Sequence, residues 1–171
     1  EKYKYMKVAN IRINGMENPV GFDFETVCVS WKVRETSARR QQNAKIEVSL
    51  KEDFSEILWE KEGKDLNSAA EKLEFTRSAY TRYYVKVTVT NDKGETAVSE
   101  PAYFETGKMD DPWMGKWITT KKEDTFHPLF IKNFEVKKKP ASARLYICGL
   151  GLFEAKLNGK KVGEEVLTPY Y

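Results

Sequence analysis

The sequence predicts an all-β protein made of one complete β-sandwich followed by part of a second β-sandwich. Three observations indicate this class. Apolar and polar residues alternate in several short segments, which is typical of strands that bury one face. Turn-forming residues separate these segments, and no segment of useful length has the 3.6-residue period of a helix. We therefore expect two antiparallel sheets within residues 1–107.

The first strong strand pattern lies between Asp23 and Val33. Val27, Val29, Trp31 and Val33 occupy alternate positions, and Cys28, Ser30 and Lys32 lie between them. Successive side chains of a strand point to opposite faces of its sheet. The pattern therefore predicts that the Trp31 side chain points into the core.

Further alternating segments follow. Ala44–Leu50 is expected to form a strand after a polar loop rich in Arg and Gln, and another strand is expected around Ile57–Trp59. The best pattern is Tyr83–Thr90, which is almost entirely β-branched or aromatic and leads into a turn at Asn91–Gly94. We expect Ala97–Thr106 to pair with it as a hairpin, at a sheet edge because this segment contains a proline.

These residues resemble a fibronectin type III domain, which is an immunoglobulin-like sandwich. The resemblance consists of an inward Trp31 and the later run T-x-Y-x-V-x-V-x-x-x-N-x-x-G at Thr81–Gly94. It implies that Tyr83 is the corner tyrosine, with a buried ring and a hydroxyl bound to nearby backbone. Arg77 and Ala79 stand where Leu and Pro are common, which predicts a less rigid corner before this strand.

A linker is expected at residues 108–112, which are rich in acidic residues and include a proline. Residues 113–171 then form a second β region. Its predicted strands are Phe130–Val136, Ala143–Cys148 and Leu152–Leu157. Asn158-Gly159 is a typical two-residue hairpin turn because both positions tolerate positive φ, and it leads into Lys160–Gly163.

This second region resembles the N-terminal, jelly-roll-like β-sandwich of bacterial α-L-rhamnosidases. The motifs in order are W-M-G-K-W-I from Trp113, F-I-K-N-F-E-V from Phe130, A-R-L-Y-I-C-G-L-G from Ala143, L-N-G-K-K-V-G from Leu157, and the turn Leu167–Pro169. The resemblance implies a large glycosidase that removes terminal α-L-rhamnose. It also implies that two carboxylates in an (α/α) barrel perform an inverting hydrolysis.

The sequence is too short for such a barrel and has no helical period. We therefore expect a non-catalytic amino-terminal fragment that is inactive alone and ends within its second domain. Its expected partners are the missing catalytic domain of the parent enzyme and, through the incomplete second domain, another copy of itself. The alternative hypothesis is a free-standing carbohydrate-binding or adhesion module.

Composition excludes other classes of partner. Lys and Arg total 29 against 26 Asp and Glu, and a dispersed net charge of +3 argues against nucleic-acid binding. No apolar stretch approaches the ~20 residues that span a bilayer, so we expect no membrane segment. Cys28 and Cys148 lie in different predicted domains, which argues against a disulfide. The location is unknown, and the cysteines favour a reducing, cytoplasmic compartment.

The sequence predicts neither a catalytic site nor a metal or cofactor site. His127 is the only histidine, so no histidine cluster can form. Adjacent acidic residues at Asp110-Asp111 and Glu164-Glu165 point in opposite directions on an extended chain, so we interpret them as solvated surface. Lys137–Lys139 could contact an anion, but such a run at a strand end more often protects an edge from pairing.

The candidates for carbohydrate contact are Trp113, Trp117 and Asn158. An indole ring can stack on the apolar face of a sugar, and Asn158 could form a hydrogen bond to a ligand. Packing is the competing interpretation for both tryptophans and for Trp59. The turn itself already explains the asparagine at position 158.

Overall fold

The computed structural model describes residues 5–121, 127–164, 166 and 168. The chain divides into two compact units, Glu1–Trp117 and Ile118–Tyr171. The domain limits given above, at residues 107 and 113, remain predictions. The described residues contain strands and no helix, so the all-β class is confirmed. No helix in this part of the chain is long and apolar enough to cross a membrane.

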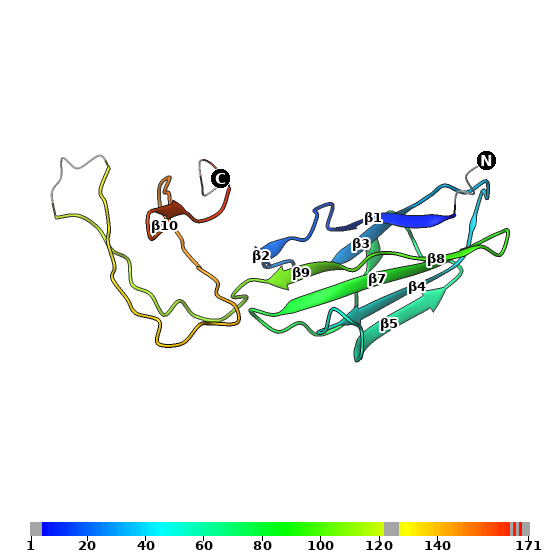
Figure 1. Cartoon of the computed structure of the whole chain (residues 1–171), viewed down its shortest axis with the longest axis horizontal. Helices are drawn as coiled ribbons and strands as arrows, with labels where there is room; N and C mark the ends of the chain where they lie inside the picture. The colour runs from blue at the N-terminus through cyan, green and yellow to red at the C-terminus, as the bar shows by residue number, and fades with distance from the viewer. Residues whose placement is uncertain (1–4, 122–126, 165, 167, 169–171) are drawn as a thin grey trace. The chain divides into compact units, whose positions relative to one another are not determined.

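The first unit is a sandwich of two sheets (Figure 1). The smaller sheet has the order β1 (Lys7–Ile13), β3 (Cys28–Arg34), β6 (Glu71–Lys72). The larger sheet has the order β2 (Val20–Phe22), β9 (Ala102–Thr106), β7 (Arg82–Asn91), β4 (Gln41–Ser49), β5 (Ile57–Gly63), and β8 (Thr96–Val98) also pairs with β7. Among the described strands of this unit, β2 and β9 pair in parallel and the others pair antiparallel.

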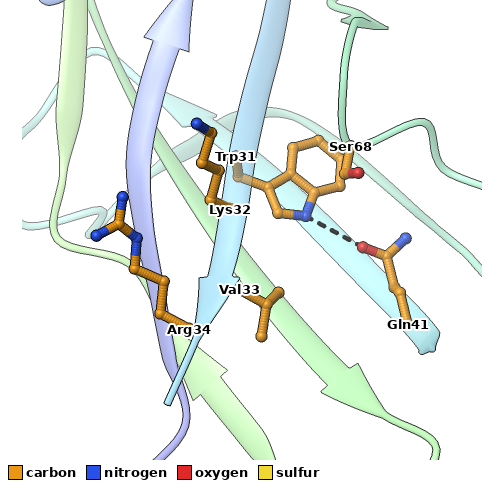
Figure 2. A pocket seen from close by; sticks show the side chains of 6 residues that line it. All are labelled: Trp31, Lys32, Val33, Arg34, Gln41 and Ser68. Carbon is orange, nitrogen blue, oxygen red and sulfur yellow. Dashed lines mark hydrogen bonds between the residues drawn. The ribbon is translucent and has the colours of Figure 1, made fainter. Parts of the chain in front are cut away.

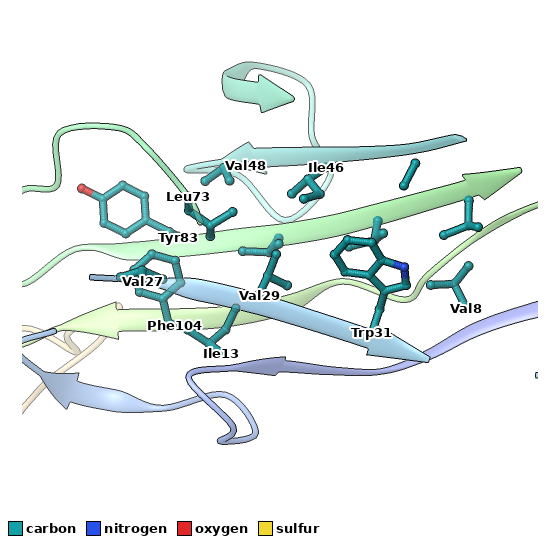
Figure 3. Close-up of a cluster of buried hydrophobic side chains, with 14 residues drawn as sticks. Val8, Ile13, Val27, Val29, Trp31, Ile46, Val48, Leu73, Tyr83 and Phe104 are labelled. Carbon is teal, nitrogen blue, oxygen red and sulfur yellow. The ribbon is translucent and has the colours of Figure 1, made fainter. Parts of the chain in front are cut away.

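The core lies between these sheets (Figure 3). Every second residue of β7 is buried, as its sequence pattern predicts. Trp31 points inward from β3 and is 4% exposed, as predicted. The buried cluster comprises Val8, Ile13, Val27, Val29, Trp31, Ala44, Ile46, Val48, Leu73, Tyr83, Val85, Val87, Val89 and Phe104. Each large side chain of this kind contributes about 1.5–3 kcal/mol when fully buried.

The corner before β7 is held by two side chains. The Tyr83 hydroxyl accepts a hydrogen bond from the Ser78 backbone N–H at 2.7 Å, so the predicted tyrosine corner is confirmed. Arg77, where Leu is common, donates from Nη2 to the carbonyl oxygens of Phe24 at 2.9 Å and Glu25 at 3.1 Å. The arginine therefore connects this corner to the segment that precedes β3.

The predicted hairpin partner of β7 is split into β8 and β9. Between them, the Ser99 backbone N–H donates to the Val87 carbonyl at 2.9 Å, and Ser99 Oγ accepts from the Val87 N–H at 3.0 Å. Pro101 follows and has no N–H with which to continue the ladder. The strand therefore breaks and resumes at Ala102.

In the second unit, β10 (Lys156–Leu157) and β11 (Lys160–Lys161) form the predicted hairpin, with φ of 50° at Asn158 and 78° at Gly159. Phe153 and Thr168 form one isolated bridge. The strands predicted at Phe130–Val136 and Ala143–Cys148 are wrong for this structure, and so is most of the one at Leu152–Leu157. A strand needs a hydrogen-bonded neighbour, and the described residues supply none there. Leu167, Pro169 and Glu165 lie outside the described residues.

Candidate functional site

The candidate carbohydrate residues occupy both units. Trp113 is 51% exposed and Trp117 is 68% exposed, and both belong to the first unit. The Lys108 ammonium nitrogen lies 5.9 Å from the centroid of the Trp113 ring. Asn158 belongs to the second unit, and its positive φ matches the demand of its turn. Both indole rings are therefore accessible for stacking, and their carbohydrate role remains a prediction.

Trp59 has a packing role, as we expected. Its ring centroid lies 6.1 Å from that of Phe75, which in turn contacts Tyr83 edge-on at 5.2 Å. Trp59 is half-buried against the core cluster. Its ring belongs to the core boundary, so we do not include it among the candidate binding residues.

The described titratable residues are arranged as surface rather than as a catalytic centre. His127, Asp110, Asp111 and Glu164 are all exposed. No group of three or more His, Cys, Asp or Glu side chains in the described part of the chain could hold a metal ion.

A groove of about 440 Å³ opens beside β3 (Figure 2). We call it the Trp31 groove; its walls are Trp31, Lys32, Val33, Arg34, Gln41 and Ser68. It exists because β6 is only two residues long and pairs with β3 only at Cys28 and Val29. The rest of that edge of β3 therefore has no strand partner.

The floor of the Trp31 groove is fixed by hydrogen bonds. The Trp31 indole Nε1 donates to Gln41 Oε1 at 3.1 Å, as Figure 2 shows, and Gln41 Nε2 donates to the Leu66 carbonyl at 2.9 Å. The Trp31 backbone N–H donates to the Ser68 carbonyl at 2.9 Å. These bonds connect β3, β4 and the loop before β6.

A partly buried ion pair joins the two sheets elsewhere in the same unit. Lys61 Nζ on β5 lies 2.8 Å from Glu71 Oε1 on β6, and Glu71 Oε2 accepts from the Asn67 N–H at 2.7 Å. Burial opposes ionisation of Glu71, but the hydrogen bonds from Lys61 and Asn67 outweigh it and lower the pKa of Glu71. We interpret the pair as structural, because neither Lys61 nor Glu71 lines the Trp31 groove.

The sequence analysis placed Trp31 in the core but did not predict the groove beside it. The one available signal is the polar, Arg- and Gln-rich segment that leads into β4, whose first residue is Gln41. Ser68 comes from a loop that carries no motif, so its place in the groove follows only from the fold.

Together, the fold and the groove define an immunoglobulin-like module without a catalytic cluster in its described residues. A family model described as "Rha78A-like, N-terminal immunoglobulin domain" matches residues 8–110, which is more than half of the chain. The chain belongs to this family. A second model, "Alpha-L-rhamnosidase N-terminal domain", matches residues 138–171.

The curated relatives that match this chain are also alpha-L-rhamnosidases. An alpha-L-rhamnosidase of Formosa agariphila (strain DSM 15362 / KCTC 12365 / LMG 23005 / KMM 3901 / M-2Alg 35-1) is 30% identical over 192 aligned residues, which cover 93% of this chain and 20% of that protein. An alpha-L-rhamnosidase of Alteromonas sp. (strain LOR) is 22% identical, with 91% of this chain and 19% of that protein covered. The chain therefore spans about a fifth of the length of these relatives.

Solved structures agree in fold. The alpha-L-rhamnosidase from Dictyoglumus thermophilum has a TM-score of 0.60 and 27% identity, covering 71% of this chain and 15% of that one. The Streptomyces avermitilis alpha-L-rhamnosidase, solved with L-rhamnose, has a TM-score of 0.57 and 24% identity, covering 67% of this chain and 12% of that one. The second likeness supports the fold alone.

Proposed function

We propose that this chain is the non-catalytic N-terminal part of an α-L-rhamnosidase, with a structural or auxiliary carbohydrate-binding role. The observation that carries the proposal is the order of the two family matches. The Rha78A-like immunoglobulin domain comes first, at residues 8–110, and the rhamnosidase N-terminal domain follows at residues 138–171. The relatives are about five times as long as this chain, which leaves room for a catalytic domain elsewhere.

The direct test is hydrolysis of an aryl α-L-rhamnoside. We expect no release of the aryl group by the 171-residue chain beyond the buffer blank. A longer product, expressed from a coding sequence that continues past Tyr171, should release it. Hydrolysis by the chain alone, or a continuation that encodes no paired-helix domain, would contradict the proposal.

The structural role rests on the exposed apolar side chains of the second unit. Leu129 is 83% exposed and Leu150 is 85% exposed, and Ile131 and Leu152 are also exposed. Apolar surface of this extent is usually covered by a partner. We infer that the catalytic domain of the parent enzyme covers it, and that the isolated chain self-associates through the same residues.

Sedimentation and hydrogen exchange test this partner. The isolated chain should sediment as a concentration-dependent mixture of monomer and oligomer, with rapid amide exchange in the second unit. In the longer protein, the same amides should become protected. A strictly monomeric chain whose second unit is fully protected would contradict the partner assignment.

The exposed Trp113 and Trp117 favour a second candidate, a free-standing carbohydrate-binding or adhesion module. Titration of the chain with rhamnose and methyl rhamnoside by calorimetry separates the candidates. Saturable binding that is lost in a Trp113→Ala/Trp117→Ala variant, together with no larger parent protein, would favour the module. If the chain binds neither rhamnose nor methyl rhamnoside, the structural role is the candidate that remains.

A further inference from the structure

Four cationic side chains surround one end of the sandwich. Lys32 and Arg34 line the Trp31 groove. Next to it lies a second cavity of about 200 Å³, the Asn91 pocket, whose walls include Val33, Ala38, Arg39, Arg40, Gln41 and Asn91. The two cavities share Val33 and Gln41. The two cavities are therefore adjacent, and their lining residues include four cations and no carboxylate.

These cations differ from most others in the same unit, because their side chains have no partner among the described residues. None of Lys32, Arg34, Arg39 and Arg40 has a side-chain ion pair or hydrogen bond to another described residue. By contrast, Lys7, Lys45, Lys61 and Lys86 each pair with a glutamate at 2.8–3.3 Å.

The acidic residues at this end are held by other groups. Glu35 pairs with Lys7 at 3.1 Å, and Asp92 Oδ1 accepts from the Arg39 backbone N–H at 3.3 Å. Glu95 accepts hydrogen bonds from Thr36 Oγ1 and Asn91 Nδ2, both at 2.6 Å, and these bonds lower its pKa. Only Glu35 is therefore paired with a cation. Asp92 and Glu95 stay ionised, and the four lining cations outnumber these two carboxylates.

The surface also offers hydrogen-bonding groups between its charges. The Ser68 hydroxyl is exposed at the groove wall and has no protein partner among the described residues. The Trp31 N–H points to the Ser68 carbonyl, so the Val33 N–H, two residues further along the strand, points to the same unpaired edge. Such groups suit the hydroxyls of a sugar ring.

Other polyanions fit less well. The Trp31 ring is 4% exposed, so the groove has no aromatic platform on which nucleic-acid bases could stack. The lining also lacks a deep apolar pocket of the kind that anchors a peptide by a buried aromatic or aliphatic side chain. The location of the two cavities also favours the binding of an external ligand. The loops β3–β4 and β7–β8 border this end, and they correspond to loops that bind ligands in other immunoglobulin folds.

We infer that the Trp31 groove and the Asn91 pocket together bind an acidic oligosaccharide, whose carboxylate or sulfate groups pair with Lys32, Arg34, Arg39 and Arg40. Arginine suits both anions, because its planar guanidinium donates two parallel hydrogen bonds to them. The inference rests on the proposed function, since it specifies the glycan that an auxiliary module of a glycosidase would hold.

The test is calorimetric titration of the 171-residue chain with tetragalacturonate, with a sulfated carrageenan tetrasaccharide, and with neutral maltotetraose. We expect saturable binding of at least one acidic ligand, and little or none of the neutral one. Comparison of the tetragalacturonate and carrageenan titrations shows whether the site binds carboxylate or sulfate groups. Binding should weaken as salt is added, because the contacts are exposed charge pairs.

Matched variants locate the site. Arg34→Gln/Arg40→Gln should weaken binding about tenfold or more, from loss of two charge-assisted contacts. Lys72→Gln/Lys160→Gln removes the same net charge from exposed positions outside both cavities and should leave binding within about twofold. Circular dichroism and thermal unfolding should be the same for both variants, because all four side chains are exposed.

Several results would overturn the inference: no acidic oligosaccharide binds, maltotetraose binds equally well, both variants lose affinity alike, or an oligoglutamate of equal charge binds more tightly. None of these results bears on the proposed function, because the aryl rhamnoside assay tests that function separately. Conversely, failure of that assay would leave any measured acidic-glycan binding in place.

Discussion

Replacement of Tyr83 by phenylalanine isolates the contribution of the tyrosine corner. Tyr83 is 2% exposed, and its ring packs between Phe75 and Phe104, each with a centroid 5.2 Å away. Its hydroxyl oxygen accepts the hydrogen bond from the Ser78 N–H. Because phenylalanine keeps the ring, the substitution removes this hydrogen bond and little else.

The expected loss of stability follows from that bond. A net intramolecular hydrogen bond contributes about 1 kcal/mol, and an unsatisfied buried donor costs about 1–3 kcal/mol. Ser78 is exposed, so water can reach part of the orphaned N–H. We therefore expect Tyr83→Phe to lower the free energy of unfolding by about 1–2 kcal/mol, or Tm by roughly 5–10 °C for a sandwich of this size.

Urea unfolding followed by far-ultraviolet circular dichroism and by tryptophan fluorescence measures this loss. Tyr5→Phe is the matched control, because Tyr5 is exposed and removal of its hydroxyl should change stability by less than about 0.5 kcal/mol. The reasoning fails if Tyr83→Phe unfolds at the same urea concentration as the wild type. It also fails if Tyr5→Phe loses as much stability.

Two further substitutions test the packing of the first unit. Since the pKa of Glu71 is lowered in the folded state, its ionised form stabilises the protein at neutral pH, and this contribution is lost as pH falls through that pKa. Glu71→Gln should cost about 1–3 kcal/mol at pH 7 and flatten the acid limb of a stability–pH curve; an unchanged acid limb would contradict the assignment. A Cβ at Gly107 would lie 2.6 Å from the Gly21 carbonyl oxygen, whereas one at Gly115 would meet nothing within 4 Å. Gly107→Ala should therefore destabilise by about 1–3 kcal/mol in thermal melts, and equal melting of Gly107→Ala and Gly115→Ala would refute the clash.

The sequence predicted the strands whose burial alternates without interruption. β3 and β7 present every second side chain to the core, β4 does so from Ala44 to Val48, and this pattern is visible in the residues themselves. The corner tyrosine was also predictable, because Tyr83 occupies a fixed place in a motif. Both features are local in sequence, so they required no knowledge of distant contacts.

Interrupted patterns were not predictable in the same way. In β1, Val8 and Ile13 are both buried although their spacing is odd, because the register shifts between Ala9 and Arg12. Asn10, with φ of 55°, lies within that irregularity. Ser99 and Pro101 break the hairpin partner of β7 in a related way. Each break shifts the buried positions by one residue. A search for alternating apolar residues therefore finds only part of each strand.

The strands expected in the second unit failed for a different reason. Phe130–Val136 and Ala143–Cys148 have apolar content that suits strands, but a strand is defined by its hydrogen-bonded neighbours. The hairpin at Asn158-Gly159 formed because its two strands are adjacent in sequence and need no third segment. Pattern alone therefore predicts a hairpin more securely than it predicts a strand whose partner is distant.

The cationic surface was the least predictable feature, because net charge conceals it. A net charge of +3 over 171 residues argued against nucleic-acid binding, and it gave no sign of a local cluster of cations. The fold, however, places Lys32 and Arg34 of one strand near Arg39 and Arg40 of the following loop, while the neighbouring Glu35 pairs with Lys7. Local charge depends on which carboxylates are already engaged. Because those engagements are long-range contacts, only the folded structure identifies the four cations that remain available to a ligand.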